Sequence, residues 1–81
     1  MAKYRKKPVV IEAEQFLPNL ADLPRAFWGF AVMEDSSGPF VAVPTLEGTM
    51  RCNPRDWLIR GVKDEVYPVK PDIFAATYEP V

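Results

Sequence analysis

The stretch NPRDWLIRGVKDEVYP, residues Asn53 to Pro68, decides the fold because it holds two apolar runs around a short polar turn. Trp57 to Val62 and Glu65 to Val69 alternate like strands, and Lys63-Asp64 separates them. Aspartate tolerates the left-handed backbone of a tight turn better than most residues. The stretch therefore predicts an antiparallel hairpin, and Asp56 is expected to fasten the turn before it.

The pairing across this hairpin follows from a two-residue turn. Arg60 is expected to lie opposite Tyr67, and Leu58 opposite Val69. Opposed residues share a face of the sheet, so the Arg60 guanidinium is placed to stack on the Tyr67 ring. Both faces of the hairpin carry apolar side chains, and one of them therefore needs a cover from outside the sheet.

Further short strands are predicted on both sides of a second hairpin. Val9 to Phe16 alternates apolar residues with Glu12 and Glu14, which is typical of a half-buried strand. Phe40 to Leu46 and Thr49 to Cys52 flank Glu47-Gly48, a two-residue hairpin signal. Phe30 to Met33 is a continuous apolar run, and the EDSSGP segment after it has the composition of a loop.

Two short helices are expected. Asp22 is a candidate N-cap for a helix from Leu23 to Trp28 that stops at Gly29. PDIFAATY, residues 71–78, predicts a second helix, because proline and aspartate suit its first turn.

The predicted fold class is α+β, with a small antiparallel sheet of five or six strands in a roll or partly open barrel. The two short helices are expected to cover the sheet. The 81 residues are enough for a single domain, 1–81. A chain of this length buries only about 60–65% of its unfolded surface, so its stability margin is expected to be small.

Three segments carry a family resemblance: YRKKPVVIEAEQF (Tyr4–Phe16), TLEGTM (Thr45–Met50) and DWLIRGVKDEVYPVKPDIFAATYEPV (Asp56–Val81). Together they resemble a group of small bacteriophage and prophage proteins of unassigned function, the PGDYG-like group. The resemblance implies a phage origin and residence in the host cytoplasm, and it implies no reaction. This chain departs from the group's pattern at Arg55 and Asp64, where the pattern has glycine.

The composition argues against an enzyme. Histidine is absent, so the usual general base near neutral pH is missing. Cys52 is the one cysteine, and it is either a nucleophile with a pKa lowered by Arg51 and Arg55 or a small packed thiol, the reading that we favour. Glu12 and Glu14 share a strand face, where they are either a functional carboxylate pair or the solvated face, which we favour. We expect no catalytic residue, no metal site and no cofactor.

The favoured function is a non-enzymatic binding module that acts through protein–protein interaction or self-association. Its partner is then a host or phage protein, or a second copy in a homo-oligomer. Tryptophan, tyrosine and arginine dominate binding hot spots. The candidate binding residues are Trp57, Arg60, Tyr67, Arg55, Lys63 and Lys70, with Trp28 as a further aromatic of this kind.

The alternative function is a small-ligand binder that sequesters a nucleotide and so counters a host defence. Arg51 joins the basic candidates in this reading, and arginines beside aromatics suit a phosphate and a base. The same charges also fit a solvated hairpin balanced by Asp56, Asp64 and Glu65. The net charge of −1 makes non-specific nucleic-acid binding unexpected. A lone thiol and the lack of a long apolar run indicate a cytoplasmic protein without membrane contact.

Overall fold

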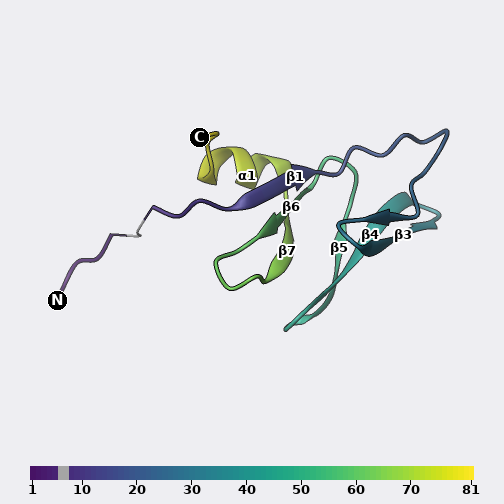
Figure 1. Ribbon diagram of the computed structural model, residues 1–81. Helices are drawn as coiled ribbons and strands as arrows, with labels where there is room; N and C mark the ends of the chain where they lie inside the picture. The colour runs from purple at the N-terminus through teal and green to yellow at the C-terminus, as the bar shows by residue number, and fades with distance from the viewer. Residues whose placement is uncertain (6–7) are drawn as a thin grey trace.

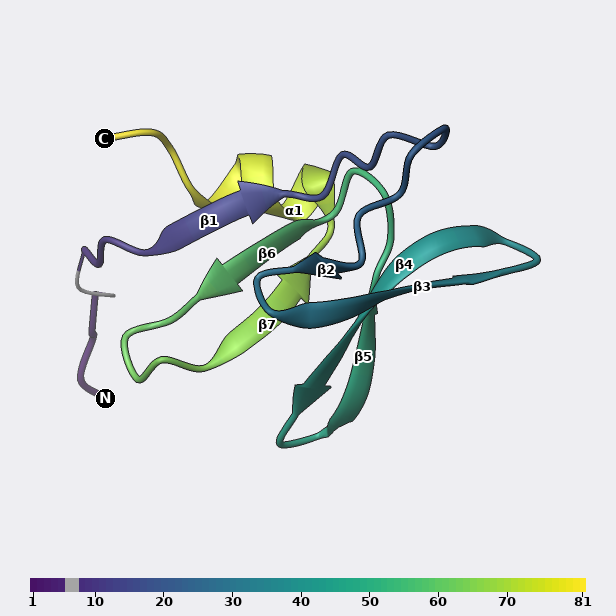
Figure 2. The same ribbon diagram turned by 45° about the vertical axis from the view of Figure 1, so that its right-hand side comes forward.

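The computed structural model describes residues 1–5 and 8–81, where it contains seven strands and one helix (Figures 1 and 2). The elements are β1 (Glu12–Gln15), β2 (Ala26–Phe27), β3 (Phe30–Asp35), β4 (Gly38–Thr45), β5 (Gly48–Cys52), β6 (Trp57–Arg60), β7 (Val66–Val69) and α1 (Pro71–Thr77). They form a three-stranded sheet in the order β1-β6-β7 and a four-stranded sheet in the order β2-β3-β4-β5. All strand pairs are antiparallel.

The predicted α+β fold, with five or six strands in one roll or partly open barrel and two helices, is therefore wrong. The chain forms two sheets that share one hydrophobic core, and a single helix in the described residues. Five side chains in this core are buried, and they come from both sheets and from the residue after β1: Phe16, Val41, Val43, Cys52 and Leu58. A small sheet needs a cover on its apolar face, and here each sheet covers the other.

The predicted helix from Leu23 to Trp28 is a second correction. These residues instead lead into a β2–β3 hairpin, in which Phe27 lies opposite Phe30. Trp28 and Gly29 form its turn with φ angles of 55° and 81°, the positive pair that favours the right-handed strand twist. So short a helix is marginal on its own, whereas the hairpin places the Phe27 ring 5.2 Å from that of Phe16. Gly29 is thus a turn residue and not a helix stop.

The segments around β4 form two hairpins rather than one. The β4–β5 hairpin is confirmed, but Gly48 already pairs with Thr45, so the turn residues are Leu46 and Glu47. The EDSSGP segment is no loop. Its first two residues end β3, and Gly38 and Pro39 begin β4, so only Ser36 and Ser37 turn the chain.

The β6–β7 hairpin is confirmed, but its predicted register is wrong by one residue. Arg60 lies opposite Val66, and Ile59 lies opposite Tyr67. The loop is longer than a two-residue turn: the Gly61 N–H donates to the Glu65 carbonyl at 2.8 Å. A shift of one residue moves side chains to opposite faces, so Arg60 and Tyr67 do not stack.

Helix α1 forms as predicted, and it covers the sheet face opposite the core. In the observed register, Ala13, Ile59 and Tyr67 share this face, while Leu58 points to the second sheet. Ile59 and Leu58 are both fully buried, because β6 is covered from both sides. The helix therefore packs on one face of the β1-β6-β7 sheet and the second sheet on the other (Figure 2).

A tight corner joins the two sheets between β5 and β6. The buried Asp56 carboxylate accepts a hydrogen bond from the Asn53 N–H at 3.0 Å, so the aspartate fastens this turn as predicted. The Lys70 ammonium lies 3.4 Å from the same oxygen. Phe16 joins the corner from β1, since its N–H donates to the Asp56 carbonyl and its carbonyl accepts from the Arg55 N–H.

Both residues that replace glycine in the phage-protein pattern have left-handed backbones, with φ angles of 78° at Arg55 and 61° at Asp64. We expect Arg55→Gly to raise the free energy of unfolding by about 1 kcal/mol, because a Cβ atom is strained in this region. Urea denaturation measures the change. Lys63→Gly is the control, since the φ angle of Lys63 is not positive, and a glycine there should destabilise the fold. A loss of stability in Arg55→Gly would contradict the view that the backbone at Arg55 is strained.

Candidate functional site

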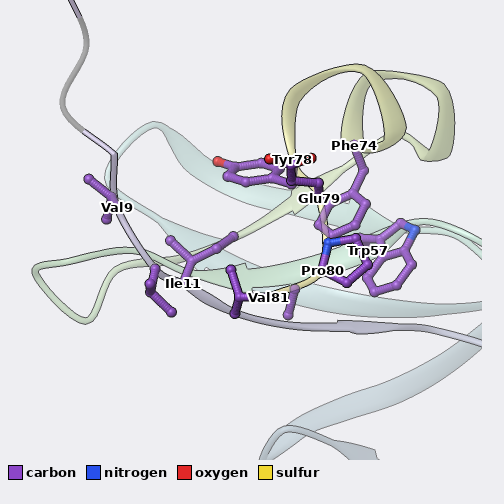
Figure 3. A pocket seen from close by; sticks show the side chains of 10 residues that line it. Val9, Ile11, Trp57, Phe74, Tyr78, Glu79, Pro80 and Val81 are labelled. Carbon is purple, nitrogen blue, oxygen red and sulfur yellow. The ribbon is translucent and has the colours of Figure 1, made fainter.

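Two adjoining concave features lie between the segment that leads into β1 and the end of α1. A cavity of about 270 Å³ is lined by Val9–Ile11 and Ala13 on one side and by Trp57, Phe74 and residues 78–81 on the other. Figure 3 shows Val9 and Ile11 on one side of this cavity and Phe74 and Tyr78 across from them. Segments from the two ends of the described chain thus form one site, which we call the β1–α1 groove.

A second cavity of about 570 Å³ extends the β1–α1 groove toward the β6–β7 loop. It shares Val9, Val10, Ile11, Tyr78, Glu79 and Val81 with the first cavity. The charged residues that line the two cavities are Glu65 and Glu79, and neither lining includes a lysine or arginine among the described residues. Among the described residues, the lining of the groove is therefore mostly apolar, and its charged side chains are acidic.

Stacked aromatic rings form the wall of the groove. The Phe74 ring lies 3.9 Å from the Trp57 ring at an interplanar angle of 4°, and the Tyr78 ring lies 5.2 Å from that of Phe74. Burial and the neighbouring Tyr78 hydroxyl raise the pKa of Tyr67, so its phenol keeps its proton at neutral pH. These rings provide a preformed apolar surface with a hydroxyl edge.

The predicted binding residues do not form one site. Trp57 lines the first cavity and Tyr67 the second, so the groove includes both. Arg60 lies on the other face of the sheet, with its guanidinium 3.7 Å from Glu12 and 5.5 Å from the centre of the Trp28 ring. The remaining three are exposed: Arg55 and Lys70 lie at the corner, where Lys70 is beside Asp56, and Lys63 lies in the β6–β7 loop.

The basic cluster of the nucleotide-binding alternative is likewise not assembled. Arg51 lies on the outer face of the four-stranded sheet, where it binds Asp35 at 2.7 Å and covers the Phe40 ring at 3.7 Å. Hydrogen bonding from Arg51 lowers the pKa of Asp35, so the pair is ionised at neutral pH. Arg51 is thus already engaged, far from the face that carries Trp57 and Tyr67.

The two glutamates of β1 lie on the exposed side of the strand and each contacts a residue of another strand or hairpin. Glu14 accepts a hydrogen bond from the Trp28 indole N–H at 2.8 Å, and Glu12 is the partner of Arg60. Trp28 thereby links the β2–β3 hairpin to the other sheet. No group of three or more His, Cys, Asp or Glu side chains in the described ranges is placed to hold a metal ion.

Cys52 ends β5 and is fully buried in the core. Burial, with a smaller effect of the Asp56 charge, raises the pKa of its thiol to about 12. The nearby arginines do not lower the pKa, contrary to the nucleophile reading. A protonated, inaccessible thiol is a packing group at neutral pH.

This burial predicts a loss of stability in alkali. Above about pH 9 the unfolded thiol releases its proton while the native thiol keeps it, so stability falls until the native pKa is reached. Between pH 8 and pH 10.5 the free energy of unfolding should fall by about 2 kcal/mol more in the wild type than in Cys52→Ala. Urea denaturation at both pH values measures this, and an equal fall in both proteins would contradict it.

The sequence does not reveal the groove residues as a site. Val9 and Ile11 are recognisable as one face of a strand, and Phe74 as part of a helix that covers a sheet. No local sequence pattern predicts that the residues near Val81 lie beside Val9. The one available signal is the apolar character of both segments, since Val10 is 77% exposed and Val81 fully exposed.

Comparisons with protein-family models, with curated proteins and with solved structures find no match to this chain. The resemblance to the phage-protein group therefore stays a prediction. In the part of the chain that the structure describes, no helix has the length and apolar character needed to cross a membrane.

Proposed function

We propose that the protein is a non-enzymatic binding module whose β1–α1 groove takes an extended segment of a partner protein. The observation that supports this is the groove itself, with its stacked aromatic rings, the exposed valines at its edge and the two glutamates among its described lining residues. Concave, mostly apolar clefts with a few polar groups are the usual places where proteins bind ligands.

The neighbouring strand adds a means of holding an extended segment. Among the described strands β1 is an edge strand, because its one partner in the sheet order β1-β6-β7 is β6. An extended peptide adds to such an edge through main-chain hydrogen bonds, while pockets beside the strand select its side chains. Here β1 offers the main-chain hydrogen-bonding groups, and the β1–α1 groove offers the pocket for side chains.

The groove's charge selects the partner segment. Glu65 and Glu79 favour a segment with lysine or arginine beside an apolar or aromatic side chain. The phage resemblance makes a bacterial or phage protein the expected source of such a segment.

Affinity capture from a bacterial lysate tests this function. The wild type should retain at least one protein that Val10→Asp loses, because a charge at this exposed edge of the groove opposes an apolar side chain. Leu20→Asp is the matched control: Leu20 is similarly exposed, at 73%, but lies outside the groove lining, so the same protein should be retained. Identical captured proteins in all three samples, identified by mass spectrometry, would contradict the groove as the site for a bacterial protein.

A further inference from the structure

We infer that the segment bound beside β1 is the N-terminal arm of a second copy of this chain, so that two copies exchange arms reciprocally. The N-terminal arm is Met1–Arg5. The inference rests on the proposed function and names its partner. The arm and the edge of β1 match in charge and in side-chain alternation, and both are exposed.

The arm is available for a partner. All of its residues are exposed, with Tyr4 at 93% and Met1 fully exposed. In both views it lies apart from the two sheets (Figures 1 and 2). An exposed tyrosine between two basic residues, Lys3 and Arg5, can contact an apolar surface and an acidic one at the same time.

The arm and β1 have complementary alternation. Side chains of an extended segment alternate between its two faces, so Lys3 and Arg5 share one face and Tyr4 takes the other. In β1, Glu12 and Glu14 share the face toward Trp28, while Ala13 points to the β1–α1 groove. An arm that pairs antiparallel to β1, with Tyr4 opposite Ala13, places Arg5 opposite Glu12 and Lys3 opposite Glu14.

This pairing gives contacts on both faces of β1, the one with the glutamates and the one that borders the groove. The two basic side chains meet the two carboxylates, and Tyr4 enters the side where Trp57 and Phe74 line the groove. Glu12 is free to accept a further partner, since 75% of its side chain is exposed beside Arg60. In a two-fold dimer each copy gives its arm and receives the other, so every such contact occurs twice.

The chain's own arm is poorly suited to the same position. To fold back on β1 in this register it would have to turn at Pro8 and Val9. A two-residue hairpin turn needs a positive φ at its first residue, and the proline ring fixes φ near −65°. Val9, being β-branched, is equally unsuited to a left-handed turn. The arm therefore reaches a second molecule more readily than its own strand.

Analytical ultracentrifugation over a concentration series tests the dimer. The wild type should sediment as a dimer in low salt, with an apparent Kd that weakens as salt is added. Lys3→Glu with Arg5→Glu should weaken the dimer about tenfold or more, because like charges then face each other. Arg25→Glu with Lys63→Glu is the control, with the same change in net charge at exposed positions away from the arm, and it should stay dimeric.

A crossed mixture decides between arm exchange and a general effect of charge. Glu12→Lys with Glu14→Lys should be monomeric alone, and mixing it with the Lys3→Glu, Arg5→Glu variant should restore a dimer that contains one copy of each. If loss of the Glu14–Trp28 hydrogen bond unfolds the double variant in a thermal melt, Glu12→Lys alone serves instead, because Glu12 is mostly solvated.

The contradicting results are distinct for the two proposals. A wild type that stays monomeric at every concentration and salt, or a crossed mixture that stays monomeric, would overturn the arm exchange. If the same protein still captures a partner that Val10→Asp loses, the proposed function stands with a different partner. If neither dimer nor captured partner is found, both proposals fail.

Discussion

The structure depends on a carboxylate buried at the corner between its two sheets. Asp56 is 4% exposed, and an ionised carboxylate in such a place is costly unless its oxygens are paired. The Asn53 N–H and the Lys70 ammonium both contact its Oδ2 atom, and they come from the turn itself and from the residue before α1. One side chain therefore fixes the turn and anchors the start of the helix.

The rest of the arrangement follows from this corner. Trp57 begins β6 directly after the corner. The Trp57 ring lies on one face of the sheet, and Leu58 lies on the other. Phe74 then stacks on Trp57 from the helix, and Leu58 packs into the core with Phe16. Because α1 is held at one end by Lys70 and along its length by Phe74, its final residues are brought beside the segment before β1. The groove is thus a consequence of the corner and not an independent feature.

The sequence predicts local pairing well, because hairpins are decided by neighbouring residues. Alternation and turn composition locate the β4–β5 and β6–β7 hairpins, and the proline and aspartate at its start locate α1. The β6–β7 register is missed, since the side chain of Glu65 binds the Lys63 N–H and stabilises a longer loop that composition does not reveal. The β2–β3 hairpin is missed because Trp28 adopts a backbone that few non-glycine residues adopt.

The candidate site lies beyond local prediction for a different reason. Trp57 and Tyr67 lie at the groove, but the predicted basic binding residues lie at several places on the molecule. Their positions depend on the β6–β7 register and on the packing of the second sheet. Val9 and Val81 become neighbours only through the packing of α1 on the sheet. Such contacts between distant segments depend on the tertiary arrangement, which no local pattern encodes.

Native-state amide hydrogen exchange at the corner tests the account most directly. The N–H groups of Phe16, Asn53 and Arg55 all donate to atoms within it. If the corner organises the fold, these three amides exchange only through global unfolding, as slowly as the amides of central strand β4. Exchange of the three amides much faster than that of β4 would show a corner that opens while the sheets persist, and would contradict its central role.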